Sequence, residues 1–247
     1  MSNYYRNNKK YELKQILLCV CEKIIQFSYL LFQFHFRFLH TIMISYQNIS
    51  LRFEDRQLFD GFSFEIAKGE KAALKGRSGS GKTTLLNMAM GFMKPDKGEI
   101  IIDGKDVNNR NISFIRKHIS WLPQSTNGFE SDTVLTLLIH PFNFHANKKI
   151  NPTQSEIDSS LLELNLERDI LNQTLDKLSG GEKQRLGIII CKLLKRKIIL
   201  LDEPTSALDK ESLRVVAGFI MADPGLTVLS ASHDDEWLKY CNKVIEL

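Results

Sequence analysis

Alternating apolar and polar positions mark two segments that follow each other soon after residue 43. The apolar members of the two segments are Ile49, Leu51 and Phe53, followed by Phe62, Phe64 and Ile66. A period of two places every second side chain on the same face, so each segment predicts a half-buried β-strand.

Continuous apolar runs and helical stretches follow one another in the rest of the chain. The predicted strands are 72–74, 99–102, 118–122, 198–201, 226–229 and 243–247. The predicted helices are Lys82–Met90, capped by Gly91, then 130–172 in pieces broken at Pro141 and Pro152, and Lys183–Leu194. Apolar strands that alternate with helices predict an α/β fold with a mainly parallel sheet covered on both faces.

The first 42 residues form an apolar and basic extension. Their charge-free run, 24–34, is shorter than the ~20 residues that span a bilayer. No small-residue cleavage site follows it, so a signal peptide is not indicated. Three interpretations remain: a helix that binds a membrane surface or a partner, a short hydrophobic anchor, or translated sequence upstream of a true start at Met43. We favour the third, because a complete pattern begins at Met43.

Charge argues against a nucleic-acid partner. The chain has a net charge of +4, and residues 1–42, with six basic and two acidic side chains, account for all of it. A domain that binds nucleic acid would carry a basic excess on its folded part. The four cysteines form no C-x-x-C pair, which fits a reducing compartment and predicts neither disulfides nor a zinc site.

A glycine-rich loop predicts a phosphate site. Residues 76–83 read Gly-Arg-Ser-Gly-Ser-Gly-Lys-Thr, between a predicted strand and a predicted helix. Glycines allow the backbone N–H groups to wrap a phosphate, and the helix adds its positive end. Lys82 should reach the β- and γ-phosphates, and the Thr83 hydroxyl should bind Mg²⁺. We include Gly76, Ser78, Gly79, Ser80, Gly81 and Thr84 in the predicted ATP site.

Two acids end the apolar strand 198–201, namely Asp202 and Glu203. Ligands of α/β proteins bind at the carboxyl edge of the sheet, where these carboxylates are expected. Asp202 should hold Mg²⁺ through water, and Glu203 should activate the attacking water.

A third motif, Leu178-Ser179-Gly180-Gly181-Glu182, precedes the helix Lys183–Leu194. A second phosphate-binding helix end in one chain is redundant unless it serves another nucleotide. The motif resembles the signature of ABC ATPases, with Glu182 at a position that is usually Gln. The resemblance covers about residues 43–247.

Further positions match that family in the expected order. Gln124 resembles the Q-loop glutamine that contacts Mg²⁺ and links the site to the membrane partner. Ser206-Ala207-Leu208-Asp209 resembles the D-loop, and His233 resembles the switch histidine that contacts the γ-phosphate. Phe53 stands where the family stacks an aromatic ring on adenine; Tyr46 competes for that role, and Phe53 as a core residue is an equal alternative.

The resemblance implies a P-loop NTPase fold: a RecA-like parallel sheet, an antiparallel β subdomain, and an inserted helical subdomain at about 125–178. It implies an ATPase, in which the P-loop of one subunit and the signature of the other enclose each ATP. All motifs of this chain look competent, which favours a homodimer over pairing with a relative. A separate transmembrane permease subunit and a peripheral place on the cytoplasmic face of the cell membrane are also implied.

The resemblance further favours transport over other uses of the cassette. The main alternative is the soluble ABC ATPase of iron–sulfur cluster assembly, whose signature helix and D-loop differ from those of this chain. The chain ends soon after His233, like the short cassettes of export or lipoprotein-release systems and of a small group thought to export iron. Export of a metal ion or a lipid is therefore the predicted task.

Overall fold

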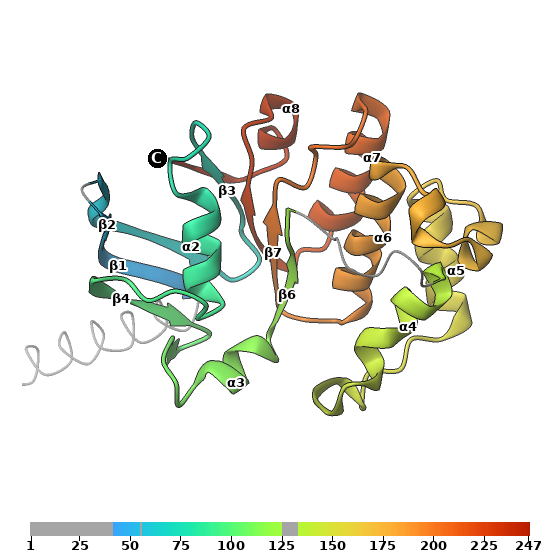
Figure 1. Cartoon of the computed structure of the whole chain (residues 1–247), viewed down its shortest axis with the longest axis horizontal. Helices are drawn as coiled ribbons and strands as arrows, with labels where there is room; N and C mark the ends of the chain where they lie inside the picture. Colours follow the sequence, from blue (N-terminus) through green and yellow to red (C-terminus); the bar gives the residue numbers. More distant parts are fainter. Residues whose placement is uncertain (1–41, 55, 125–132) are drawn as a thin grey trace, which may run out of the picture. The chain divides into compact units, whose positions relative to one another are not determined.

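The computed structural model describes residues 42–54, 56–124 and 133–247. Except for Ile42, the predicted extension 1–42 lies outside the described residues, as do residues 125–132 of the predicted helical subdomain. Residues 42–247 form one unit built of two sheets and the helices between and beside them (Figure 1). None of the helices in these described ranges has the length and hydropathy that crossing a bilayer requires.

An antiparallel sheet contains the two strands predicted from the alternating pattern. Its strand order is β2-β1-β4-β5, and β1 pairs with both β2 and β4. The strands are β1 (Ile42–Phe53), β2 (Arg56–Ala67), β4 (Lys97–Ile102) and β5 (Lys105–Asp106). Asp103 and Gly104, both with positive φ, form the tight turn between β4 and β5. The prediction of the two alternating strands and of the strand 99–102 is confirmed, whereas β5 was not predicted.

A parallel sheet forms the centre of the molecule, with the order β6-β7-β8-β3-β9. Every strand pair in it is parallel, as predicted. The strands are β3 (Lys71–Lys75), β6 (Ile119–Leu122), β7 (Ile198–Asp202), β8 (Thr227–Ala231) and β9 (Lys243–Glu246). Because all its strands run the same way, their carboxyl ends share one edge.

Helix α2 packs in the cluster that includes the antiparallel sheet, whereas α4, α5, α6 and α7 pack in the cluster on the other face of the parallel sheet. The bounds of the helices are α2 (Lys82–Ala89), α3 (Ile112–Arg116), α4 (Val134–Asn143), α5 (Gln154–Glu163), α6 (Gly180–Leu193), α7 (Lys210–Met221) and α8 (Asp235–Leu238), with 3₁₀ turns at His145–Asn147, Arg168–Asn172 and Leu175–Lys177. The predicted cap of α2 is present: Gly91 has φ +66°, and the N–H groups of Gly91 and Phe92 donate to the carbonyls of Met88 and Asn87.

Two hydrophobic clusters meet across the central strand β7. Ile198 and Leu200 belong to the cluster that contains α2 and the antiparallel sheet. Ile199 and Leu201 belong to the cluster that contains α4, α5, α6 and α7. The alternation along β7 therefore builds one core on each face of the parallel sheet.

Two helix boundaries differ from the prediction. Pro141 does not break α4, which continues through it to Asn143. The buried side chains of Leu138 and Phe142 hold this last turn against the core, and tertiary packing overrides the cost of the proline. The signature helix begins at Gly180 rather than Lys183, because Ser179 is its N-cap and the two glycines form its first turn.

Candidate active site

The P-loop lies at the carboxyl end of β3, where Gly76–Gly81 leads into α2. Gly79 and Gly81 have φ of +77° and +102°, in the region that favours glycine. A Cβ on Gly81 would come within 2.4 Å of the Phe59 ring, so a side chain there would clash. No side chain caps the start of α2. The backbone N–H groups at this helix end are therefore open to an anion.

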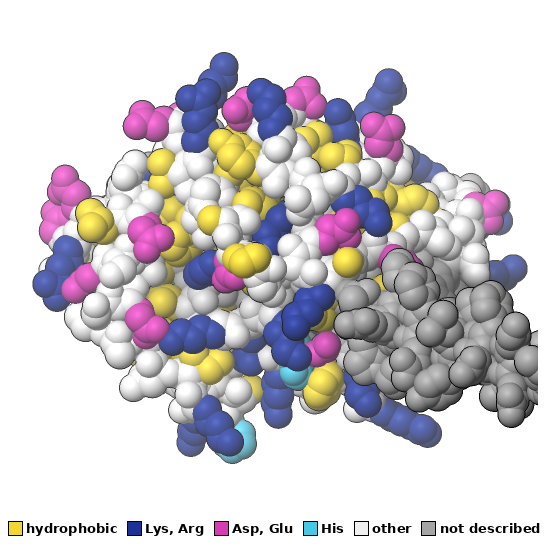
Figure 2. Space-filling view, turned by 180° about the vertical axis from the view of Figure 1, so that it is seen from behind, with side chains coloured by type: hydrophobic (Ala, Val, Ile, Leu, Met, Phe, Trp, Pro, Cys, Tyr) yellow, Lys and Arg dark blue, Asp and Glu magenta, His cyan; other side chains and the backbone are white. Residues whose placement is uncertain are grey.

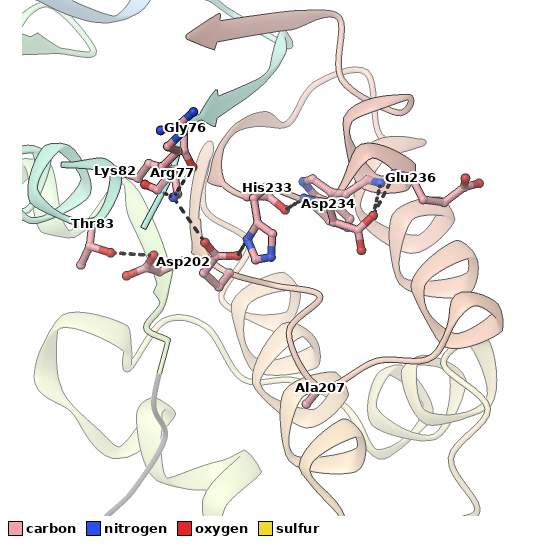
Figure 3. Close-up of polar contacts among 12 residues, drawn as sticks. Gly76, Arg77, Lys82, Thr83, Asp202, Ala207, His233, Asp234 and Glu236 are labelled. Carbon is pink, nitrogen blue, oxygen red and sulfur yellow. Dashed lines mark hydrogen bonds and ion pairs between the residues drawn. The ribbon is translucent and has the colours of Figure 1, made fainter. Parts of the chain in front are cut away.

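Lys82 points back into this loop from the first residue of α2 (Figure 3). Its Nζ donates to the carbonyl oxygens of Gly76, at 2.8 Å, and Arg77, at 3.3 Å. The side chain is buried, and its ammonium lies 3.7 Å from Oε1 of Glu203. A buried ammonium that contacts two carbonyls and a carboxylate can exchange those partners for phosphate oxygens.

Asp202 and Thr83 meet where β7 ends beside the start of α2. The Thr83 hydroxyl donates to Oδ1 of Asp202 at 3.0 Å. Burial raises the pKa of Asp202 above its ordinary value of 3.8, and nearby Glu203 raises it further, against the effect of the Thr83 hydrogen bond. These two oxygen-bearing side chains are the ligand type that Mg²⁺ prefers, and Mg²⁺ takes its remaining ligands from water and phosphates.

Glu203 has a strained backbone, with φ of +48°. Its N–H donates to the carbonyl of Ala231 at 2.9 Å, which ties it to the neighbouring strand β8. His233 follows β8, and its Nδ1 lies 3.1 Å from Oε2 of Glu203. Figure 3 shows Lys82 on one side of the site and His233 on the other, with Asp202 beside Thr83 on the Lys82 side. The carboxylate of Glu203 thus joins the P-loop lysine to the histidine.

The hairpin of β1 and β2 brings an aromatic ring and an arginine to the same cleft. Phe53 pairs with Arg56 across the hairpin, and both line the cleft. The Phe53 side chain is 45% exposed, so it is not a core residue, whereas Tyr46 is fully buried and its hydroxyl donates to the Leu85 carbonyl. Of the two aromatic candidates, only Phe53 is accessible to a base.

The cleft has a volume of about 650 Å³. Its lining contains most of the residues predicted for the ATP site: Phe53, Gly76, Ser78, Gly79, Gly81, Lys82, Thr83, Thr84, Gln124, Glu203 and His233. Ser80 lies in the same loop, and its hydroxyl is buried without a hydrogen-bond partner among the described residues. An unpaired buried hydroxyl in a glycine-lined loop fits a nucleotide phosphate as its missing partner.

The signature residues do not belong to this cleft. Ser179 and Gly180 are exposed at the start of α6. Ser179 and Glu182 form a capping box: the N–H and hydroxyl of Ser179 donate to Oε2 of Glu182 at 2.8 and 2.7 Å, and the Glu182 N–H donates back at 3.3 Å. The Ser179 hydrogen bonds lower the pKa of Glu182. At neutral pH the cap therefore carries a negative charge.

The first turn of α6 packs against the segment that follows Glu203. A Cβ on Gly181 would lie 3.0 Å from the carbonyl oxygen of Ala207, so this close approach favours glycine. Gln184 bonds to the same segment through both atoms of its amide. Sequence reasoning missed Gln184 and Arg56. Arg56 could have been found as the partner of Phe53 across the hairpin, and Gln184 as a polar position in an apolar helix.

The chain matches the family model described as "ABC transporter" over residues 59–206. It is 31% identical to the ergothioneine transport ATP-binding protein EgtV of Helicobacter pylori (strain G27), covering 83% of this chain and 97% of that protein. It is 32% identical to the probable iron export ATP-binding protein FetA of Escherichia coli (strain K12), covering 83% and 91%.

The fold also matches a solved structure. A dimeric ATP-binding cassette in a post-hydrolysis state, bound to ADP and Pi, superposes with a TM-score of 0.72 and 25% identity. The match covers 83% of this chain and 94% of that one. The predicted P-loop NTPase fold is confirmed.

Proposed function

Because the chain belongs to the ABC transporter family, as an ATP-binding subunit with ATPase activity, we propose that it hydrolyses ATP in a dimer with shared sites and drives transport through a separate membrane subunit. The observation that carries the proposal is the contact of one carboxylate, that of Glu203, with both Lys82 and His233 at the mouth of the P-loop cleft.

In the proposed reaction the chain's own residues hold the phosphates and move one proton. Lys82 leaves the carbonyls of Gly76 and Arg77 and binds phosphate oxygens. Glu203 accepts the proton of the water that attacks the γ-phosphate, which yields ADP and inorganic phosphate. His233, whose Nδ1 lies 3.1 Å from Oε2 of Glu203, keeps that carboxylate in place.

The remaining site residues bind rather than react. Thr83, Asp202 and Gln124 would hold Mg²⁺, which when bound neutralises charge on the phosphate oxygens. Phe53 offers its exposed ring to the adenine. The strained conformation of Glu203 is a further sign of function, because such residues cluster at active sites.

The exposed signature end supports a dimer with shared sites. Ser179 and Gly180 lie outside the P-loop cleft of their own chain, on the surface, although the start of α6 is a site for an anion. A second copy placed head to tail would bring its signature to this chain's ATP. Two identical chains then form two equal sites, the homodimer that the motifs favour.

An exposed aromatic surface near β6 supports the membrane partner. Phe92 is 55% exposed and Phe114 is 41% exposed. The Phe92 ring packs 5.4 Å from the ring of Trp121, and Arg116 lies over it at 4.7 Å. The groove beside them has a volume of about 860 Å³. A helix of the membrane subunit, docked here and on the segment after Gln124, would place the chain peripherally on the cytoplasmic face of a membrane.

Charge on the face that Figure 2 shows does not favour a nucleic-acid partner. The face in Figure 2 shows Lys and Arg side chains interspersed with Asp and Glu. A phosphate backbone selects a continuous basic stripe. This distribution supports the sequence-based expectation that no nucleic acid is bound.

The transported substrate belongs to the proposal as well. The two relatives named above are called an ergothioneine transport protein and a probable iron export protein. Export of a metal ion remains the substrate prediction that fits the second name, with a lipid as the other candidate. Neither name favours the alternative role in iron–sulfur assembly. Copurification with a membrane subunit, followed by transport assays on that complex, tests this part.

Replacing Glu203 tests the mechanism. Glu203→Gln keeps the shape and removes the base, so turnover should fall ~10²–10⁴-fold while ATP still binds. Since hydrolysis is what opens the proposed shared site, the variant should accumulate as a dimer in Mg-ATP. Phosphate release and size-exclusion chromatography measure both effects, with Glu163→Gln on α5 as the matched control.

Each outcome bears on a different part of the proposal. Normal turnover of Glu203→Gln would remove this carboxylate from the catalytic role. A variant that turns over slowly but stays monomeric in saturating ATP would count against the shared-site dimer.

A further inference from the structure

One side chain of α6 holds the segment that carries Glu203. Gln184 lies in the second turn of the helix and is half-buried. Its Nε2 donates to the Glu203 carbonyl at 2.7 Å, and its Oε1 accepts from the N–H of Ala207 at 3.0 Å. A single planar amide therefore joins both ends of the turn between β7 and α7 to the signature helix.

The turn that Gln184 holds contains the strained backbone of Glu203. Glu203 has φ of +48°, a conformation that persists only where its surroundings fix it. Its N–H is bonded to Ala231, and its carbonyl also accepts from the Ser206 N–H at 3.3 Å. The Gln184 bond adds a side chain from a third element, so strand β8, the turn itself and helix α6 together set where the Glu203 carboxylate points.

The side-chain amide of Gln184 has the chemical groups that these two hydrogen bonds require. The position needs a donor toward the Glu203 carbonyl and an acceptor toward the Ala207 N–H. A carboxylate supplies only acceptors, and an aliphatic side chain supplies neither. The neighbouring Arg185 turns instead toward α7, where its Nη1 donates to the Ser212 hydroxyl at 3.3 Å.

We infer that Gln184 is a positioning residue for hydrolysis, which links the place of the signature helix to the aim of the Glu203 carboxylate. The inference rests on the proposed role of Glu203. In the proposed dimer, Ser179 at the start of α6 contacts the partner's ATP, while Gln184 holds the base that serves the chain's own ATP. A shift of α6 at one site would then move the carboxylate at the other.

Gln184→Glu tests the inference with a change of almost no volume. At pH 8 the new carboxylate cannot donate to the Glu203 carbonyl, so kcat should fall, by about 10–10²-fold for a misplaced group. The affinity for Mg-ATP should stay within about twofold, because Gln184 does not line the cleft. Gln173→Glu makes the same chemical change away from this turn and should leave kcat unaltered.

The pH profile separates positioning from a merely structural role. A protonated carboxyl at position 184 has the donor and the acceptor of the amide, so kcat of Gln184→Glu relative to the unsubstituted chain should rise between about pH 8 and about pH 5.5. Arg185, Glu203 and Asp209 are charged residues of α6 and of the turn that it holds, and the ratio at each pH removes the pH effects that both chains share. Gln184→Met, which cannot regain the bonds, should show a reduced ratio that does not rise.

The outcomes are distinguishable from failure of the proposed function. If Glu203→Gln is slow but Gln184→Glu keeps the unsubstituted kcat, the inference is overturned while the role of Glu203 stands. An equal, pH-independent loss in Gln184→Glu and Gln184→Met also overturns it. If Gln184→Glu does not fold, Gln184→Met decides: a lower kcat with unchanged ATP affinity supports the inference, and an unchanged kcat overturns it.

Discussion

Two helix starts in this chain offer backbone N–H groups to an anion, and they differ in what already occupies them. The start of α2 has glycine at its N-cap and no side-chain cap. The start of α6 is closed by the capping box of Ser179 and Glu182. The first is completed only by a ligand. At the second, the N–H groups of Ser179 and Glu182 are already bonded within the chain, so in the proposed dimer a partner's phosphate has to replace or share those contacts.

The carboxylates beside the two helix starts also differ, in the direction in which their surroundings shift the pKa. Asp202, near α2, is buried, and its pKa is raised. Glu182, in α6, is stabilised as an anion by Ser179, and its pKa is lowered. The negative charge of Asp202 beside the P-loop is therefore unfavourable until a cation binds, whereas the negative charge of Glu182 at the signature is stabilised without a nucleotide.

The largest effect on nucleotide affinity should follow from Lys82→Ala, which removes the cation from the open helix end. A hydrogen bond to a charged group contributes about 1.5–3 kcal/mol, so Mg-ATP affinity should fall by ~10–10²-fold, with the fold intact. Equilibrium nucleotide titration measures it, and Lys105→Ala in β5 is the control. Unchanged Mg-ATP affinity would contradict the assignment of residues 76–83 as the phosphate-binding loop.

Ser179→Ala should instead act on the closed helix end. Loss of the cap costs about 1 kcal/mol of stability, but ATP binding to a single chain should be unaffected. In a Glu203→Gln background the ATP-dependent dimer should weaken. Thr153→Ala is the matched control, because it opens the similar capping box of α5. If both variants weaken the dimer equally, the signature end has no special part in it.

Asp202→Asn should stabilise the nucleotide-free chain while it abolishes Mg²⁺-dependent turnover. An acid with a raised folded pKa loses stability as pH rises from 3.8 through that folded value, so the ionised Asp202 is unfavourable at pH 7. Removing it should raise the free energy of unfolding by the ~0.5–2 kcal/mol that is typical of a stabilising substitution. The gain should shrink as pH falls toward 3.8. Thermal unfolding at several pH values checks this, against Asp106→Asn. A lower melting temperature at pH 7 would contradict it.

The smallest effect is expected from a chain that starts at Met43. Both helix starts lie beyond that residue, and Met43 itself is buried, with its carbonyl accepting from the Asp103 N–H at 2.9 Å. Such a chain should fold, bind ATP and dimerise like the full chain. Precipitation, or loss of ATPase activity while the full chain is active, would make residues 1–42 part of the machinery.

The sequence predicted the fold correctly where the signal is local. The P-loop, the acids after β7 and the signature are short runs, and each lies at the strand end or helix start that the sequence predicted. The parallel strands were evident from apolar runs between helices. The carboxyl edge of the sheet then brings Lys82, Glu203 and His233 together, as the order of elements implied.

The missed features depend on contacts between distant segments. Pro141 would end an isolated helix, but the packing of Phe142 carries α4 past it. Gln184 bonds to residues 19 and 23 positions away, which no local pattern records. The sequence could not distinguish Phe53 from Tyr46 as the ring accessible to adenine, because both are aromatic residues of β1. The exposed fraction of each side chain in the structure distinguishes them.

The alternation of β7 side chains between the two hydrophobic clusters also determines how the molecule unfolds. Its fully buried side chains alternate between the two clusters, so one strand register satisfies both at once. A slip of one residue would exchange the two sets and carry Asp202 and Glu203 off the edge of the sheet. Because both hydrophobic clusters share β7, neither cluster can unfold and displace this strand while the other stays ordered. Residues 42–247 should therefore unfold in one cooperative transition, and hydrogen exchange in β7 should require that global opening.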